Sequence, residues 1–509
     1  MKLSLPRGPL TRALALLVVL ALLGTVGYFG YRVWTDDSCA EGVTEVGKEC
    51  VGVTDGSYVF TDDLGPVSAR IKEENDSVAG KNPVTVALMI PLVSDAQAER
   101  REMVEQVQGA YLAQHRANGQ SGHQPPVRLV LANPGRGYGQ WLRVSNQLAR
   151  LAAGKENLRA VTGINISISA TKAAVGHLTG TLHIPVVAGP MTADDIANTD
   201  GAPEAFPGLA RVAPSNTDQA DALTHYGADI KPAESLVIED TRKDDNYIAT
   251  LREAFAKLTK GAPHAPESFE SPADFNEEGN LGGEFDRMVP GICNSPARTL
   301  FFAGRPVQLR LFLVALADRK CVRPFTVITG SHASTLMVDQ KFEREWPSLK
   351  ENGGTTVRYT ALAHPDTWGP QSPASAGGSK DASAELAGML TAEATRQPDR
   401  IGPADLRDGR VIVTYDAVST AVAGIRLETG GAVTMPSLKE VALSWRRLHA
   451  DNRVEGASGW ICLDSKGNPH NKAVPIVHLD PDSRSAVLDG TAWPLGKAPD
   501  ENCSIAAGG

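Results

Sequence analysis

Residues 160–195 read AVTGINISISATKAAVGHLTGTLHIPVVAGPMTADD, and this stretch decides the fold of the chain. Residues 160–164 form a short apolar run that contains β-branched side chains, and residues 170–182 carry the apolar spacing of a helix. Residues 184–188 form a second apolar run, which ends just before Pro190. A strand, a helix and a strand within so short a stretch predict two parallel strands joined by a helical crossover.

The segments that follow these two strands are rich in serine and threonine. In open parallel sheets, ligands bind beyond the carboxyl ends of the strands, and residues 165–171 and 189–192 occupy that position. Serine and threonine are also common helix caps and turn residues, so Ser169 and Thr192 have a purely structural alternative. The sequence predicts a small-molecule site whose candidate residues are Ser167, Ser169, Ala170, Thr171, Pro190 and Thr192.

The same alternation of strands and helices continues along the chain. It predicts a doubly wound α/β architecture, and a chain of 509 residues is too long for one ordinary core. Surface segments are expected at residues 261–280 and 365–384, and a hairpin at 456–468. Further strands are predicted at residues 84–90, 127–131, 235–239, 299–303 and 325–329, and helices at 101–116, 141–153, 246–258 and 307–317.

The N-terminal part contains an uncharged apolar run at residues 13–31, preceded by basic residues and followed by acidic ones. Such a run predicts a transmembrane anchor, with residues 1–12 in the cytoplasm and the remainder outside the cell. A cleaved signal peptide is the alternative, although no Ala-x-Ala-like site follows. The polar, acidic residues 32–83 predict a juxtamembrane spacer.

Charge and cysteine content restrict the partners and the compartment. A net charge of −9 without a basic run argues against nucleic acid as a partner. Six cysteines in an exported chain favour disulfides. Local spacing and strand position suggest three pairs, although the cysteine count alone permits other connectivities: Cys39–Cys50, Cys293–Cys321 and Cys462–Cys503.

Motifs for catalysis, cofactors and metals are absent from the sequence. There is no Walker, His-Glu-x-x-His or Gly-x-Ser-x-Gly pattern. Residues 135–140, GRGYGQ, depart from the dinucleotide loop because the third glycine falls early. The 11 histidines show no metal-ligand spacing. We therefore expect no catalytic residue, no metal and no cofactor.

Several further pieces of sequence occur in a characteristic order around the opening stretch. They include TVALMIPL at 85–92, SLVIEDTRKDDNYIATLREAF at 235–255 and VIVTYDAVSTAV at 411–422. With these pieces, residues 84 to about 480 resemble the type I periplasmic binding proteins, in particular the leucine/isoleucine/valine- and amide-binding branch. The resemblance implies two Rossmann-like lobes joined by three crossovers, with lobe 1 at 84–213 and 358–450 and lobe 2 at 214–357 and 451–509.

The resemblance also assigns roles in a ligand site. Ser169 and Thr192 match the hydroxyls with which the family binds a carboxylate, and Tyr247 would act as a lid aromatic. Arg305 stands where the family has an aromatic side chain, and Ser331 where it has an acid. A missing acid argues against a zwitterionic amino acid, whereas Arg305 suits an anionic or amide-bearing ligand. A solvated loop arginine is the alternative for Arg305.

The function implied by the resemblance is binding without catalysis. It is an extracytoplasmic, membrane-tethered solute-binding protein that closes on a small carboxylate- or amide-bearing ligand and presents it to an ABC-transporter permease. The alternative is a membrane-anchored sensor or interaction module that uses the same clamp without transport. An enzyme has no motif in its support.

Overall fold

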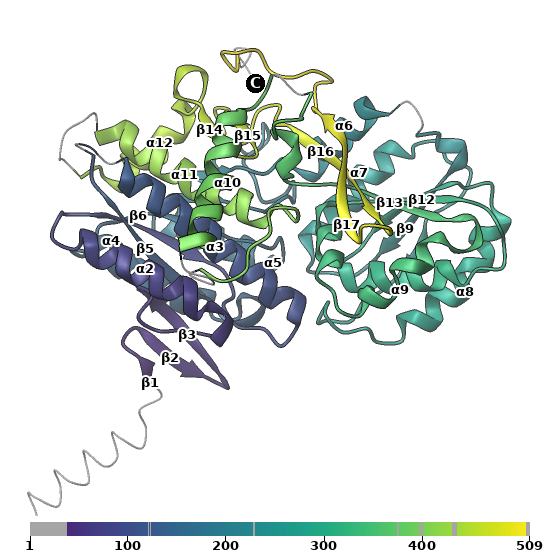
Figure 1. Cartoon of the computed structure of the whole chain (residues 1–509), viewed down its shortest axis with the longest axis horizontal. Coiled ribbons are helices and arrows are strands. Elements are labelled where there is room, and N and C mark those ends of the chain that lie inside the picture. The colour runs from purple at the N-terminus through teal and green to yellow at the C-terminus, as the bar shows by residue number, and fades with distance from the viewer. Residues whose placement is uncertain are drawn as a thin grey trace, which may run out of the picture.

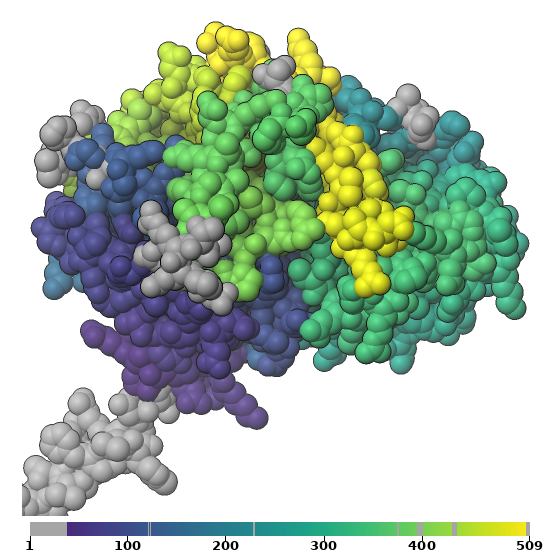
Figure 2. All heavy atoms as spheres, in the orientation of Figure 1, coloured from purple at the N-terminus to yellow at the C-terminus, as the bar shows by residue number. Residues whose placement is uncertain are grey.

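The structure is a computed structural model of the chain, and it forms two α/β lobes side by side (Figure 1). It describes residues 38–120, 122, 124–227, 230–373, 376–396, 401–429 and 435–504. Within the described residues, one sheet has eight strands, another has seven, and a two-stranded hairpin stands apart. On the face shown in Figure 2, the yellow C-terminal segment lies between the green and teal parts of the surface.

The sheet of lobe 1 has the strand order β1-β2-β3-β5-β4-β6-β7-β8. Its central strands pair in parallel, and β3 joins the antiparallel edge to β5. The predicted strands at 84–90, 127–131, 160–164 and 184–188 all lie here. The bounds are β1 Ser38–Ala40, β2 Val43–Val46, β3 Glu49–Thr54, β4 Val84–Met89, β5 Val127–Asn133, β6 Leu158–Gly163, β7 Val186–Ala188 and β8 Leu209–Arg211.

Helices cover both faces of this sheet, because successive strand residues point to opposite sides. Val86 and Leu88 of β4 pack into one apolar core, while Ala87 and Met89 pack into the core on the other face. The first core is covered by α2 Gly65–Val78, α3 Gln97–Gly119, α11 Arg410–Thr429 and α12 Leu438–Ser444, beside which lies α10 Lys380–Arg396. The second is covered by α4 Trp141–Ala153 and α5 Ser169–Gly176, which continues as a π-helical turn at His177–Thr181.

The sheet of lobe 2 has the order β10-β9-β11-β12-β13-β16-β17. The first five strands pair in parallel, and β16 and β17 add antiparallel strands at one edge. Strand β10 lies within residues 261–280, where the sequence predicts only a surface connection. The bounds are β9 Ser235–Asp240, β10 Glu267–Phe269, β11 Thr299–Ala303, β12 Phe325–Thr329, β13 Thr355–Thr360, β16 Val474–Asp480 and β17 Ser485–Ala492.

Two apolar cores again sandwich this sheet. Leu300 and Phe302 of β11 face one core, and Phe301 and Ala303 face the other. The first core is covered by α8 Leu281–Asn294, α9 Pro306–Ala317 and the 3-10 turns Ser331–Met337, Phe342–Arg344 and Trp346–Gly353. The second is covered by α6 Asn216–Tyr226 and α7 Asn246–Leu258.

The chain crosses between the lobes three times, as the resemblance implies. The first crossover lies at residues 212–215 and the third at 462–473, and the described parts of the second are residues 361–373 and 376–379. The last one falls later than the predicted boundary at 450, because the hairpin β14 Val454–Gly456 and β15 Gly459–Ile461 packs into the core of lobe 1. The hairpin itself starts slightly before the predicted range 456–468.

The predicted spacer at 32–83 has a different place in the structure from the one expected. From residue 38 onward it supplies β1, β2, β3 and α2 to lobe 1, and Val53 pairs with Ala132 of β5. No helix in the described part of the chain is long and apolar enough to cross a membrane. The predicted span at 13–31 and the tail at 1–12 lie outside the described residues.

The three suggested disulfides are present. Cys39–Cys50 ties β1 to β3, and Cys293–Cys321 links the end of α8 to the turn before β12. Cys462–Cys503 fastens the C-terminal segment to the third crossover. The described residues therefore contain no free cysteine.

Candidate functional site

The predicted hydroxyl residues between β6 and α5 bond mainly within lobe 1. The Oγ of Ser167 accepts a hydrogen bond from the Ala193 N–H at 3.3 Å. Thr171 is buried, and its Oγ1 accepts from the Ile168 N–H at 3.0 Å and donates to the Ile166 carbonyl at 2.7 Å. Ile168 is the cap residue of α5, so Ser169 is the first residue inside the helix.

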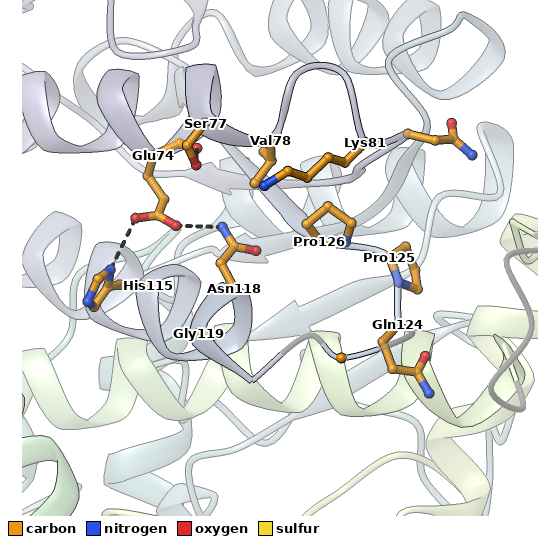
Figure 3. A pocket seen from close by; sticks show the side chains of 12 residues that line it. Glu74, Ser77, Val78, Lys81, His115, Asn118, Gly119, Gln124, Pro125 and Pro126 are labelled. Carbon is orange, nitrogen blue, oxygen red and sulfur yellow. Dashed lines mark hydrogen bonds and ion pairs between the residues drawn. The ribbon is translucent and has the colours of Figure 1, made fainter.

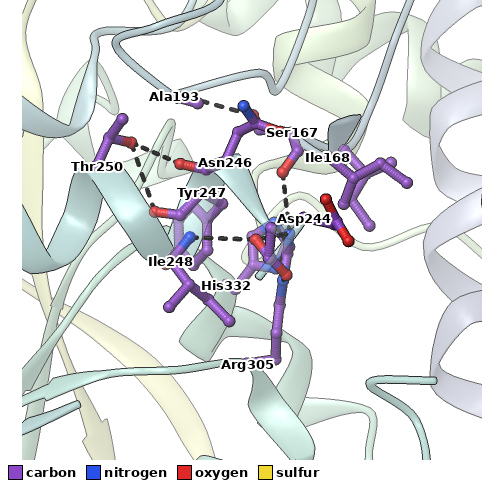
Figure 4. A network of polar contacts seen from close by, with 12 residues as sticks. Ser167, Ile168, Ala193, Asp244, Asn246, Tyr247, Ile248, Thr250, Arg305 and His332 are labelled. Carbon is purple, nitrogen blue, oxygen red and sulfur yellow. Dashed lines mark hydrogen bonds and ion pairs between the residues drawn. The ribbon is translucent and has the colours of Figure 1, made fainter. Parts of the chain in front are cut away.

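The loop after β9 in lobe 2 reaches across to this helix N-terminus (Figure 4). The Asp244 carbonyl accepts hydrogen bonds from the Ser169 N–H at 3.2 Å and from its Oγ at 3.4 Å. The Tyr247 N–H donates to the Ser167 carbonyl at 3.0 Å. A carbonyl oxygen of the chain itself therefore occupies the helix N-terminus at which the sequence predicts a ligand carboxylate.

Arg305 of lobe 2 is completely buried where it contacts lobe 1. Its Nε and Nη2 donate to the two carboxylate oxygens of Asp245, both at 2.8 Å, and Nη2 also donates to the Ser167 carbonyl at 3.3 Å. Planar two-point pairing of this kind compensates both charges in a buried place. Arg305 is thus neither a solvated loop arginine nor free to pair with a ligand in this arrangement.

Two rings stack beside this ion pair. Tyr247 and His332 have ring centroids 4.6 Å apart, and the Arg305 guanidinium carbon lies 4.7 Å from the Tyr247 centroid. Burial and the neighbouring Arg305 hold the pKa of His332 well below its usual range, so the neutral ring accepts from Arg305 Nη1 at 2.9 Å. Burial raises the pKa of Tyr247 to about 12, which keeps its hydroxyl protonated.

The remaining predicted residues lie near this contact, but they do not line the cleft described next. Pro190 and Thr192 are buried, and the Thr192 carbonyl accepts from the Asn216 N–H at 2.8 Å. Ala170 is half-buried on α5. Ser331 is buried, and its Oγ has no hydrogen-bond partner. Of the residues predicted from sequence, Arg305 lines the cleft described next.

A cleft of about 890 Å³ lies between the lobes at the carboxyl ends of their parallel strands. Lobe 1 lines it from the exits of β4 and β6, the first turns of α3 and the start of α11. Lobe 2 lines it from the loop after β9, residues 273–276, the start of α9 and residues 332–341. The size is within the range of small-molecule sites.

Contacts between lobes also close over this cleft. The Asn276 Nδ2 of lobe 2 donates to the Glu99 Oε1 of lobe 1 at 2.8 Å. The Thr335 hydroxyl donates to Glu102, which is also paired with Arg410 at 3.1 Å. Burial raises the pKa of the Glu102 carboxyl. Sequence reasoning missed these acids, because their position on α3 reads as an ordinary polar helix face.

A second cavity of about 430 Å³ lies on lobe 1, away from all the predicted site residues (Figure 3). Glu74 of α2 accepts from His115 at 3.1 Å and from Asn118 at 2.9 Å, both on α3. The hydrogen bond to Glu74 raises the pKa of His115, and the bonds from His115 and Asn118 lower the pKa of Glu74 against the effect of burial. No group of three or more potential metal ligands occurs among the described residues.

No protein-family model and no curated protein matches the chain. Among solved structures, the leucine-binding protein LivK of Thermotoga maritima has a TM-score of 0.57 at 16% identity, over 81% of this chain and 100% of its own. LivJ of Streptococcus pneumoniae, in complex with isoleucine, has a TM-score of 0.56 at 14% identity, over 81% and 99%.

A solute-binding protein of R. palustris in complex with 4-hydroxybenzoate is similar to the same extent. Its TM-score is 0.56 at 14% identity, over 81% of this chain and 96% of its own. The three are a leucine-binding protein, a substrate-binding protein of a branched-chain amino acid transporter and a solute-binding protein of an ABC transporter. At the level of the fold they confirm the resemblance: the chain has the architecture of the type I periplasmic binding proteins.

Proposed function

We propose that the chain is an extracytoplasmic solute-binding protein that holds a small carboxylate- or amide-bearing ligand between its lobes and presents it to an ABC-transporter permease. The observation that carries this proposal is the cleft of about 890 Å³ between the two sets of strand ends. The ligands bound in two structures with the same fold, isoleucine and 4-hydroxybenzoate, are small carboxylates. The function is binding, with no catalytic step.

Closure of the lobes would provide the affinity. The three crossovers permit a hinge motion, and closure removes the ligand from water and completes its hydrogen bonds. Contacts such as Glu99–Asn276 and Ser169–Asp244 join the lobes directly and would form as the clamp shuts. In this proposal the Arg305–Asp245 pair supports one wall of the cleft.

Export to the cell surface belongs to the same proposal. Three disulfides suit an oxidising compartment. The apolar run at 13–31 would then tether the domain to the membrane, with everything after it outside the cell.

A sensor without transport is the second candidate. The direct bonds between Ser167 and Arg305 and between Ser169 and Asp244 join the lobes through the chain's own atoms. In a module that reports its open or closed state to a partner protein, such bonds would hold the lobes in the closed state. Uptake of a radiolabelled ligand by a strain that lacks the gene for this chain separates the candidates. Loss of uptake supports transport, and unchanged uptake supports sensing.

Ligand binding itself is tested by a thermal-shift screen of the purified chain. The panel contains amino acids, amides, dicarboxylates and small aromatic acids. A ligand present at 100 times its Kd stabilises the folded state by about 2.7 kcal/mol, which the melting temperature reports. One or more stabilising compounds, confirmed by calorimetry, support the proposal. A panel with no stabilising compound contradicts it.

A further inference from the structure

Arg242 differs from the other cations that line the cleft in having no carboxylate partner among the described residues. It follows β9 in the loop that contacts lobe 1, and its side chain lines the cleft. No carboxylate among the described residues lies within ion-pair distance of its guanidinium. Its Nη1 is covered from solvent and has no hydrogen-bond partner. A buried donor without an acceptor is uncommon, so the structure leaves one cationic donor here unsatisfied.

The other cations that line the cleft already have carboxylate partners on the chain. Arg242 therefore differs from an ordinary surface arginine, which has charged neighbours of both signs. The paired cations are Arg136 with Glu49 and Asp95, Arg305 with Asp245, Arg310 with Glu278 and Asp339, Lys341 with Glu278, and Arg410 with Glu102.

The carboxylates that line the cleft are likewise satisfied by donors of the chain. Glu99 accepts from Ser94 at 2.6 Å as well as from Asn276, and the exposed Asp274 accepts from the Asn276 N–H at 2.9 Å. The remaining three are Asp95, Glu102 and Asp339, each in an ion pair. Every carboxylate that lines the cleft therefore already accepts from a donor of the chain, although Glu99 and Asp274 bond only to neutral donors, and Arg242 is the lining cation without a carboxylate partner among the described residues.

An aromatic ring lies beside Arg242, and further apolar side chains line the same cleft. The Arg242 guanidinium carbon lies 5.5 Å from the ring centroid of Phe275, which also lines the cleft. Met103 and Ile166 of lobe 1 line the cleft as well. Nearby on α3, Gln106 lines the cleft while only 1% exposed, and its Oε1 has no partner. A ligand with an apolar body and an anionic end would match Phe275 and Arg242, and a hydrogen-bond donor on the ligand would in addition satisfy Gln106.

We propose that the cleft takes an organic anion that pairs one carboxylate group with Arg242, lays an apolar body between the lobes, and needs no ammonium group. The inference rests on the proposed solute-binding function and deepens it by naming the class of ligand. It also explains the occupied N-terminus of α5: the Asp244 carbonyl takes the donors of Ser169, and the ligand carboxylate binds on the opposite lobe.

Calorimetry with four probes tests the proposal on the full chain. The probes are benzoate, benzamide, isocaproate and leucine. Benzoate and benzamide share a ring and differ in charge, while isocaproate is leucine without its amino group. We expect benzoate or isocaproate to bind. The neutral benzamide or the zwitterionic leucine should bind at least about tenfold more weakly than its anionic counterpart, which is the size of effect expected for the loss of a charged hydrogen bond. Tighter binding of leucine than of isocaproate, or of benzamide than of benzoate, overturns the inference.

Variants locate the anion. Arg242→Gln should weaken the bound carboxylate by about ten- to a hundredfold, whereas Arg242→Lys retains most of the affinity. The matched control is Arg143→Gln, which removes an exposed arginine of α4 outside the cleft and should leave binding unchanged. Wild-type affinity in Arg242→Gln overturns the assignment of this residue.

The inference and the proposed function fail in different ways. Binding of leucine or an amide that ignores Arg242 overturns the inference and leaves the solute-binding function standing. If none of the four probes binds, the anion inference fails. The solute-binding function itself fails only if the broader thermal-shift panel also yields no stabilising compound.

Discussion

Removal of the Asp245 carboxylate probes the buried contact between the lobes. The Asp245 and Arg305 side chains are both 0% exposed, and two hydrogen bonds of 2.8 Å join them. In Asp245→Ala, the Arg305 guanidinium would remain buried with only neutral acceptors, the Ser167 carbonyl and His332. An uncompensated buried charge destabilises the folded state strongly, so the free energy of unfolding should fall.

The size of the effect follows from two separate losses. Breaking a buried ion pair by removing one partner costs about 3 to 5 kcal/mol. The Asp245 side chain also caps α7 by accepting from the Ile248 N–H at 3.1 Å, and loss of such a cap costs about 1 kcal/mol. We therefore expect Asp245→Ala to lower the free energy of unfolding by about 4 to 6 kcal/mol.

Urea unfolding, followed by tryptophan fluorescence, measures the change. The double variant Asp245→Ala/Arg305→Met removes both charges and should be far more stable than the single variant, because replacing a buried pair by apolar groups is often nearly neutral. Asp482→Ala, which removes an exposed partner of Lys350, is the control and should cost about 1 kcal/mol or less. A loss below about 1 kcal/mol in Asp245→Ala, or a double variant as unstable as the single one, would refute the reasoning.

Three further predictions concern other parts of the structure. The pKa of His115 is raised in the folded chain, so its charged pairing with Glu74 stabilises the folded state fully when the pH is below the unfolded pKa of 6.5. This stabilisation is lost as the pH rises through the higher folded pKa. In a His115→Gln variant, the free energy of unfolding should lose this pH dependence. The paired change Cys293→Ser/Cys321→Ser opens a loop with a sequence separation of 28 and should cost about 3 to 4 kcal/mol in chemical denaturation. A Cβ at Gly330 would overlap the Tyr247 hydroxyl, so Gly330→Ala should lower the melting temperature. Gly282→Ala, at an open position in α8, should not lower it, because alanine favours the helix, and equal shifts in both variants would contradict the packing described.

The alternation of strands and helices was predictable because buried parallel strands give continuous apolar runs. The strands at 299–303 and 325–329 and the helices at 141–153 and 246–258 match the structure. The short strands β1 to β3 were not foreseen, because their sequence is polar and acidic and they are held at the sheet edge by pairing with β5 and by Cys39–Cys50. Edge pairing is a tertiary effect that local pattern does not reveal.

The closeness of some predicted site residues in space was predictable, but their pairing was not, and their ligand-binding role stays a prediction. The sequence placed Ser167, Tyr247 and Arg305 near one another at strand exits, and the structure brings them into contact. It did not reveal that Asp245, a helix-capping acid by its spacing, neutralises Arg305. Nor did it distinguish Arg242 from other loop arginines, since the distinction depends on which charges lie nearby in space. The ligand roles expected for Ser169 and Thr192 stay a prediction.

A crystal structure of the chain with its tightest-binding solute tests the central claim most directly. The account predicts electron density for the solute in the cleft between the lobes, enclosed by residues of α3 on one side and of the loop after β9 on the other. A solute bound elsewhere, for example in the cavity beside Glu74 and His115, would contradict the account.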